Sequence, residues 1–163
     1  KYLDLTKELF IPNKDFDEIK KLIAKENEER VNLLYDGSTY ECRKKHMSKI
    51  KTNVFKYPCI QYINKKNIPT KIYYSNKNIG HFGIKKNIID ELSNEIYIDY
   101  NGEYGMCQHC FCIIDAIENL DNIKTALKSE KFLKLNTSVF QLGKYNKNII
   151  KYFKKDFYLN FLK

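Results

Sequence analysis

Tryptophan, long apolar runs and flexible linkers are all missing from this 163-residue chain. It has no Trp, six Gly and three Pro, so neither a Gly/Ser-rich nor a proline-rich linker is expected. No apolar run approaches the roughly 20 residues that span a bilayer, and there is no signal-peptide pattern. With 43% hydrophobic and 14% aromatic residues, the sequence is not a disordered tail. It predicts one domain over residues 1–163 that has no membrane partner.

The cysteine count also argues against a secreted scaffold. Five Cys cannot all pair, so we expect reduced thiols in a cytoplasmic protein. The Cys-x2-Cys spacing of Cys107 and Cys110, together with Cys42 and His46, leaves open a zinc-stabilised nucleic-acid-binding domain. Against zinc, Cys110 and Cys112 fall in a predicted strand, where successive side chains point to opposite faces. Buried free thiols without metal are the simpler interpretation.

Acidic residues are absent from positions 42–89, although the same segment holds 12 Lys and Arg residues. The net charge of +9 is therefore concentrated in one third of the chain. Such a field attracts a polyanion, and we expect duplex DNA as the partner. Basic side chains would hold phosphates and neutral polar side chains would reach base edges. The predicted phosphate contacts are Arg43, Lys44, Lys45, Lys49, Lys51, Lys85 and Lys86. The predicted base contacts are Ser75, Asn76, His81, Gln108 and His109.

The pattern of apolar residues predicts an α+β fold, with a mixed, mostly antiparallel sheet and helices at the N-terminus and in the C-terminal third. We expect an N-terminal helical segment over 1–30, a basic strand-rich part over 31–118 and C-terminal helices over 119–163. A first helix would begin at Asn13 or Asp15 and end near Glu29. Strands are predicted at 31–35, 58–63, 71–75, 86–90 and 95–100. Residues 64–67 would connect one hairpin, and Asn101-Gly102 would turn a second hairpin into a strand over 103–114. A helix over 120–135 with Asp121 as N-cap and one or two short helices over 144–162 would follow.

Signatures of catalysis are missing as well. The chain has no Gly-x-Ser-x-Gly elbow, no phosphate-binding loop and no dinucleotide fingerprint. A small metal-dependent DNA endonuclease remains an alternative, because Asp90, Asp99 and Glu103 form the densest acidic group after the basic segment. We favour surface carboxylates for these three residues, so no catalytic residue and no metal ligand is assigned.

Several motifs resemble the target-recognition (specificity) domain of restriction-modification DNA methyltransferases, of the Taq-type N6-adenine group and its relatives in large DNA viruses. The resemblance covers most of the chain from about Val31 onward. It rests on short motifs: Tyr73-Tyr74-Ser75, Gly80-His81-Phe82-Gly83-Ile84-x-Lys86, Ile98 to Met106 with Gln108-His109, Asn119 to Phe132, and Phe153 to Phe157.

The resemblance implies that this chain reads duplex DNA while a catalytic methyltransferase domain acts on the base. That domain would belong to the same longer polypeptide or to a partner subunit, and it would bind S-adenosylmethionine. The chain itself lacks the cofactor loop and the Asn-Pro-Pro-aromatic motif of such enzymes, so no cofactor is expected on it. Cys107 and Cys110 depart from the small or hydroxylated residues usual in these sequences, which favours core packing over metal binding.

Overall fold

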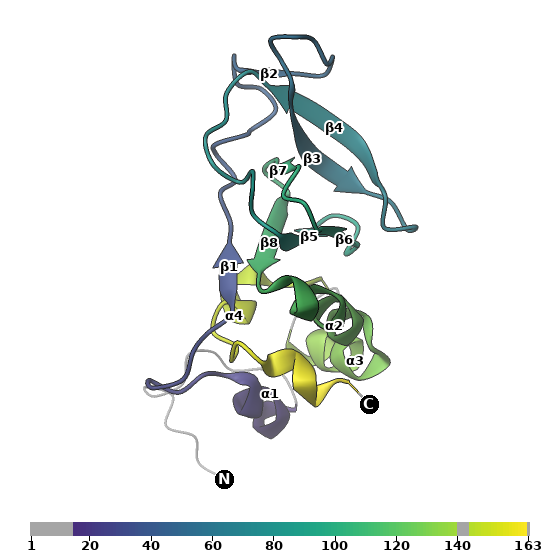
Figure 1. Cartoon of the computed structure of the whole chain (residues 1–163). Coiled ribbons are helices and arrows are strands. Elements are labelled where there is room, and N and C mark those ends of the chain that lie inside the picture. Colours follow the sequence, from purple (N-terminus) through teal and green to yellow (C-terminus); the bar gives the residue numbers. More distant parts are fainter. Residues whose placement is uncertain (1–14, 140–143, 163) are drawn as a thin grey trace.

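The computed structural model describes residues 15–139 and 144–162, which form two four-stranded sheets and a layer of helices (Figure 1). The predicted α+β fold is confirmed, as is a mixed, mostly antiparallel strand arrangement, since β3 and β7 form the one parallel pair among the described strands. In the described ranges no helix is both long and apolar enough to cross a membrane.

The lower sheet is wholly antiparallel and has the strand order β1-β8-β5-β6. Its strands are β1 (Asn32–Leu34), β5 (Lys86–Asp90), β6 (Ile96–Asp99) and β8 (Cys110–Ile114). Side chains of its central strands alternate between two cores, as the period-2 geometry of a strand requires. Ile89 and Phe111 pack under the helices, whereas Ile88 and Cys110 pack toward the upper sheet.

Helices cover the lower face of this sheet (Figure 1). They are α1 (Phe16–Leu22), α2 (Ile117–Lys128), α3 (Glu130–Val139), α4 (Lys147–Ile150) and a 3-10 helix (Phe157–Asn160). Phe132 lies at the centre of an aromatic group, with its ring 5.0 Å from that of Phe161 and 6.2 Å from that of Phe157. These rings share one core with Leu22 of α1, so the two ends of the described chain pack together.

The upper sheet has the order β2-β4-β3-β7 and is built around one long hairpin. Its strands are β2 (Met47–Ser48), β3 (Tyr57–Ile63), β4 (Pro69–Ser75) and β7 (Gly105–Met106). The predicted hairpin forms, and residues 64–68 connect β3 to β4, one residue more than predicted. The Asn64 side chain accepts the backbone N–H groups of Lys66 and Ile68, and Asn67 takes the left-handed conformation that asparagine tolerates.

The Asn101-Gly102 hairpin prediction is wrong. β6 pairs only with β5 among the described strands, and the chain after the turn crosses to the upper sheet, where β7 joins β3. The Asp99 carboxylate accepts the N–H groups of Glu103 and Tyr104 and so directs the chain away from β6. Gly102 has φ 71° and lies against the backbone of Gly83, where a side chain would collide.

Two helix predictions are also corrected. The first helix ends at Leu22 instead of Glu29, because Ile23 is extended and bridges Phe153. Asp15 precedes this helix without a side-chain cap, and Asn13 lies outside the described residues. The predicted 120–135 helix is two helices separated at Ser129, and its first N-cap is Ala116 instead of Asp121.

Candidate nucleic-acid interface

Basic side chains gather at the end of the upper sheet where β4 finishes. Ser75 pairs with both Met47 and Tyr57, so the loops that flank β2, β3 and β4 converge there. A backbone hydrogen bond from Asn76 to His46 ties two of these loops together. We call this group the basic end; its charged members are Arg43, Lys44, Lys45, Lys49, Lys51, Lys56 and Lys77.

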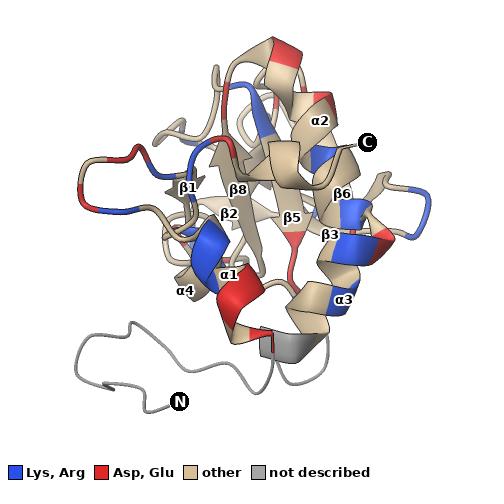
Figure 2. Cartoon of the chain, turned by 90° about the horizontal axis from the view of Figure 1, so that it is seen from below, with Lys and Arg blue, Asp and Glu red and all other residues tan. Residues whose placement is uncertain are grey.

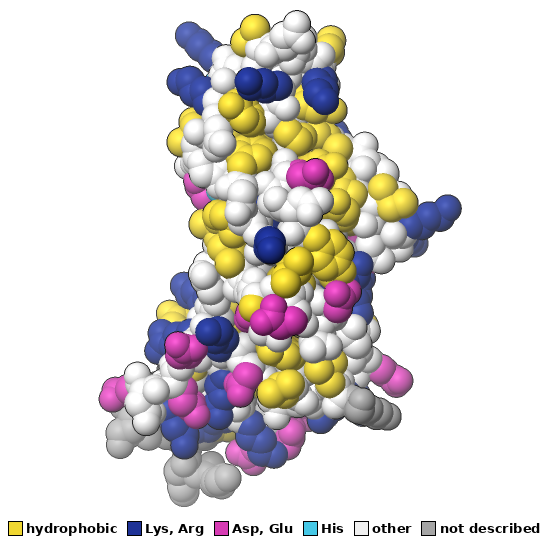
Figure 3. Space-filling model, viewed as in Figure 1, with side chains coloured by type: hydrophobic (Ala, Val, Ile, Leu, Met, Phe, Trp, Pro, Cys, Tyr) yellow, Lys and Arg dark blue, Asp and Glu magenta, His cyan; other side chains and the backbone are white. Residues whose placement is uncertain are grey.

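All seven charged members of the basic end are exposed. Arg43 donates to Glu41 at 2.6 Å, but no described carboxylate forms an ion pair with any of the six lysines. Figure 3 shows Lys and Arg side chains, in dark blue, at the top of the molecule, the end at which Figure 1 places β2. The basic end therefore carries positive charge that the described part of the protein does not neutralise.

The helical half of the molecule differs in its charge balance. Figure 2 shows Lys and Arg interspersed with Asp and Glu on α1, α2 and α3. Lysines there pair with nearby carboxylates, for example Lys147 with Glu91 and Lys155 with Glu29. The basic end thus differs from the helical half, where positive and negative side chains are interspersed.

Four other predicted contacts are accessible to different degrees. Asn76 is exposed at the basic end, and Lys85 is exposed in the segment between β4 and β5. Gln108 is half-buried and its side-chain oxygen accepts the N–H of Cys42 at 3.2 Å. His109 is half-buried, and its carbonyl accepts the N–H of Glu91. Asn76 is the residue of this group best placed beside the basic loops.

Lys86 cannot hold phosphate as predicted. Its side chain is fully buried, and its ammonium donates to Asp99 at 2.8 Å and to the carbonyls of His81 and Ile84 at 2.8 and 3.0 Å. The three donors of the ammonium are satisfied inside the protein. Lys86 is a structural residue that ties the 80–85 loop to β6.

Ser75 and His81 are likewise buried and are not available to base edges. The Ser75 hydroxyl accepts the N–H of Lys77, which shapes the turn after β4. His81 accepts the N–H of Met106 at Nδ1 and stacks edge-on against Tyr40 at 4.9 Å. Burial lowers the pKa of His81, although Asp36, 3.7 Å from Nε2, acts in the opposite direction. Both residues hold loops in place.

Two of the three carboxylates of the nuclease alternative have structural partners, and the third, Glu103, is exposed. Asp90 is fully buried and accepts the N–H of Ile63 and of Leu92, each at 2.8 Å, so it links the two sheets. Asp99 is engaged by Lys86 and by two backbone N–H groups. Within residues 15–139 and 144–162, no three His, Cys, Asp or Glu side chains are grouped to hold a metal ion. The nuclease alternative therefore receives no support.

All five cysteines are free thiols, and four of them are fully buried. Burial raises the pKa of Cys112 to about 12 and also raises that of Cys59 and Cys110. Cys42 is only half-buried, and a hydrogen bond from Cys107 lowers its pKa. In the part of the chain that the structure describes, these thiols and the histidines are not grouped to hold a metal ion, so the zinc alternative is not supported either.

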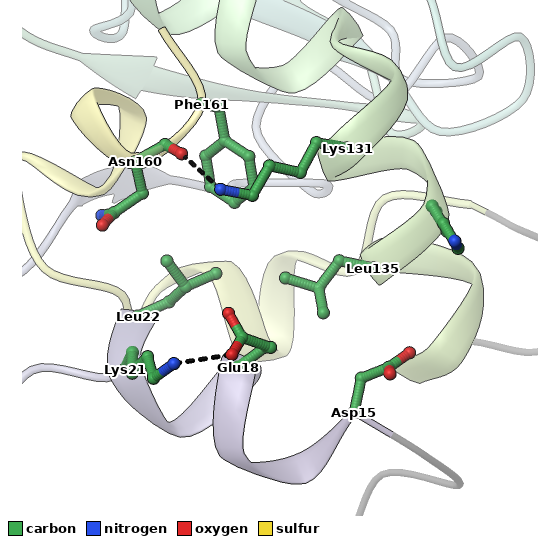
Figure 4. A pocket seen from close by; sticks show the side chains of 9 residues that line it. Asp15, Glu18, Lys21, Leu22, Lys131, Leu135, Asn160 and Phe161 are labelled. Carbon is green, nitrogen blue, oxygen red and sulfur yellow. Dashed lines mark hydrogen bonds and ion pairs between the residues drawn. The ribbon is translucent and has the colours of Figure 1, made fainter. Parts of the chain in front are cut away.

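One small hollow lies apart from the basic end, between α1, α3 and the 3-10 helix (Figure 4). It has a volume of about 170 Å³, and Leu22 and Leu135 face each other across it. Lys131 donates to the carbonyl of Asn160 at 3.0 Å, and Lys21 pairs with Glu18. These charges are satisfied internally, so the hollow shows no chemistry that selects a ligand.

Sequence reasoning left several accessible basic residues out of the predicted contacts. Lys56 and Lys77 belong to the basic end, and Lys71 is exposed on β4. Lys56 also lies over the ring of Tyr57, 5.4 Å from its centroid. The acid-free segment 42–89 could have indicated all three residues, because every exposed lysine in it is a candidate for a phosphate contact.

Comparison with known protein families, with curated proteins and with solved structures found no match to this chain.

Proposed function

We propose that the protein is a sequence-specific duplex DNA-binding module, the target-recognition domain of a DNA methyltransferase or restriction-modification enzyme. The basic end supplies the sequence-independent attraction to phosphates. Asn76, which is exposed among these lysines, is the first candidate for reading a base edge, because an amide both donates and accepts.

The observation that carries this proposal is the cluster of six exposed lysines without a described carboxylate partner. Leaving such charges close together costs free energy through mutual repulsion, and a polyanion removes that cost. The loops that carry these charges are held by internal hydrogen bonds. In one of them the Thr52 hydroxyl accepts the N–H groups of both Val54 and Phe55. A charged surface built on defined loops suits a partner of regular shape such as a duplex.

In this proposal the chemistry belongs to another domain. A catalytic methyltransferase domain binds S-adenosylmethionine and takes the target base out of the stack, while this chain positions the duplex. The basis for this division is the resemblance of the motifs, together with the lack of catalytic signatures in the sequence.

Salt dependence of binding tests the electrostatic part of the proposal. If about five phosphates are contacted, the slope of log affinity against log salt is about −4.5. The double variant Lys44→Ala/Lys45→Ala should reduce the size of this slope by about 2 and weaken binding to all sequences alike. Fluorescence anisotropy with a labelled 20-bp duplex at several salt concentrations measures both effects.

The matched control is Lys151→Ala/Lys155→Ala, which removes the same charge from the helical half. The slope of log affinity against log salt for this control should equal that of the unaltered protein within experimental error. An equal effect of the two double variants would refute an interface at the basic end. Selection from a pool of randomised duplexes then tests sequence specificity. Recovery of one common site that Asn76→Ala no longer prefers supports recognition, whereas an unenriched pool contradicts it.

A further inference from the structure

An open groove lies at the opposite end of the β3–β4 hairpin from the basic end. It runs between the 64–67 turn, β6 and α2, which lie next to one another in Figure 1, and has a volume of about 1010 Å³. The Asn67 side chain hydrogen-bonds the backbone of Ile96 and anchors the turn beside β6. The groove is therefore framed by fixed elements and has the size of a ligand site.

Lysines stand on both walls of the groove. Lys65 and Lys66 project from the hairpin turn, and Lys124 and Lys128 from α2. Lys128 pairs with Glu95, whereas no described carboxylate forms an ion pair with the other three. The groove thus holds more positive than negative charge.

The positive charge around Lys124 is only partly compensated by nearby carboxylates. Burial and the nearby Lys128 ammonium, one helical turn away, lower the pKa of Lys124, and Asp121 and Glu95 offset this only in part. An anion bound between the walls would relieve that repulsion. The electrostatics accordingly favour an anionic ligand along α2.

Two tyrosines line the groove between these walls. The Tyr100 hydroxyl donates to Asp121 at 2.8 Å, while the side chain remains 40% exposed. The Tyr97 ring is supported edge-on by Tyr104, with centroids 5.5 Å apart and planes at 84°. Both rings are held in place before any ligand arrives, so little side-chain freedom is lost on binding.

We propose that this groove binds an unpaired strand of nucleic acid, with its phosphates between the lysine walls and its bases against Tyr97 and Tyr100. Proteins that bind single strands commonly place lysines beside aromatic side chains, because the lysines hold the phosphates and every unpaired base has a face that can stack on a ring. In a duplex those faces are already stacked on neighbouring bases. The proposal does not depend on duplex binding at the basic end.

Binding of a fluorescein-labelled 12-nucleotide oligothymidylate to the full chain tests the groove. Lys66→Ala/Lys124→Ala should weaken this binding at least about tenfold and change duplex binding by less than about threefold. Tyr100→Ala should also weaken it about tenfold, and Tyr100→Phe, which keeps the ring, should retain most of the affinity. Circular dichroism of each variant checks that the fold is intact.

The matched control, Lys44→Ala/Lys45→Ala, should give the reverse pattern, with a larger loss for the duplex than for the oligothymidylate. Equal losses for both ligands in every variant, or no oligothymidylate binding by the unaltered chain, would overturn the groove proposal. Loss of duplex binding alone would count against the proposed function and leave the groove standing.

Discussion

The ammonium group of Lys86 is the centre of a buried polar cluster. Because Lys86 and Asp99 are 0% and 1% exposed, removing one leaves the other charge without its partner. We expect Lys86→Met to lower the free energy of unfolding by about 3–5 kcal/mol. Its exposed neighbour offers a control, since Lys85→Met should change stability by less than about 0.5 kcal/mol. Urea unfolding followed by circular dichroism measures both, and equal stabilities would contradict the structural role of Lys86.

Most lysines lie at the surface, as their residue type predicts, but Lys86 is buried. A lysine is rarely buried unless it is paired, so composition places it at the surface by default. Its partner, Asp99, lies in a different strand, and only the β5–β6 pairing brings the two together. His81 was misplaced for a similar reason, because its contacts with Tyr40 and Met106 span distant parts of the sequence.

At the scale of elements, Ser129 determines where α2 ends and α3 begins. Its hydroxyl donates to Ala126 at 2.7 Å and accepts the N–H of Phe132 at 3.1 Å, so it caps α3. Loss of an N-cap hydroxyl costs about 1 kcal/mol, so Ser129→Ala should destabilise the protein by about that amount. Asn122→Ala on the exposed face of α2 is the control, and a thermal melt that ranks the two variants equally would count against the cap.

The strands of the upper hairpin could be predicted from sequence because their signals are local. Apolar runs at 58–63 and 71–75 and the turn between them lie within one short segment. The prediction of a second hairpin was wrong because its turn, Asn101-Gly102, packs against the 80–85 loop, and no local sequence pattern indicates that contact. The acid-free segment predicted the basic end. The groove could not be predicted, because it depends on how the fold places the hairpin turn and α2 on either side of it.

In the molecule as a whole, the reactivity of the buried thiols depends on whether the two sheets stay packed together. Cys59 and Cys107 pack in a cluster with Tyr40, Met47 and Tyr73, and Cys110 and Cys112 pack in the cluster between the sheets. We expect Ellman's reagent to modify Cys42 alone in the native protein and all five thiols after denaturation. Cys42→Ser should abolish the native reaction. Rapid modification of Cys110 or Cys112 would mean that the sheets separate in the native state.

The central position of β8 in the lower sheet has a consequence for synthesis on the ribosome. β1 and β5 both pair with β8, which is translated after them, and Ile23 bridges Phe153 near the other end of the chain. The nascent chain therefore carries β1 without a partner until β8 has emerged, while the β3–β4 hairpin has all its own residues much earlier. The hairpin that links the basic end to the groove is thus able to form first. The lower sheet can close once β8 has emerged, and the bridge between Ile23 and Phe153 forms only when translation of the described segment is almost finished.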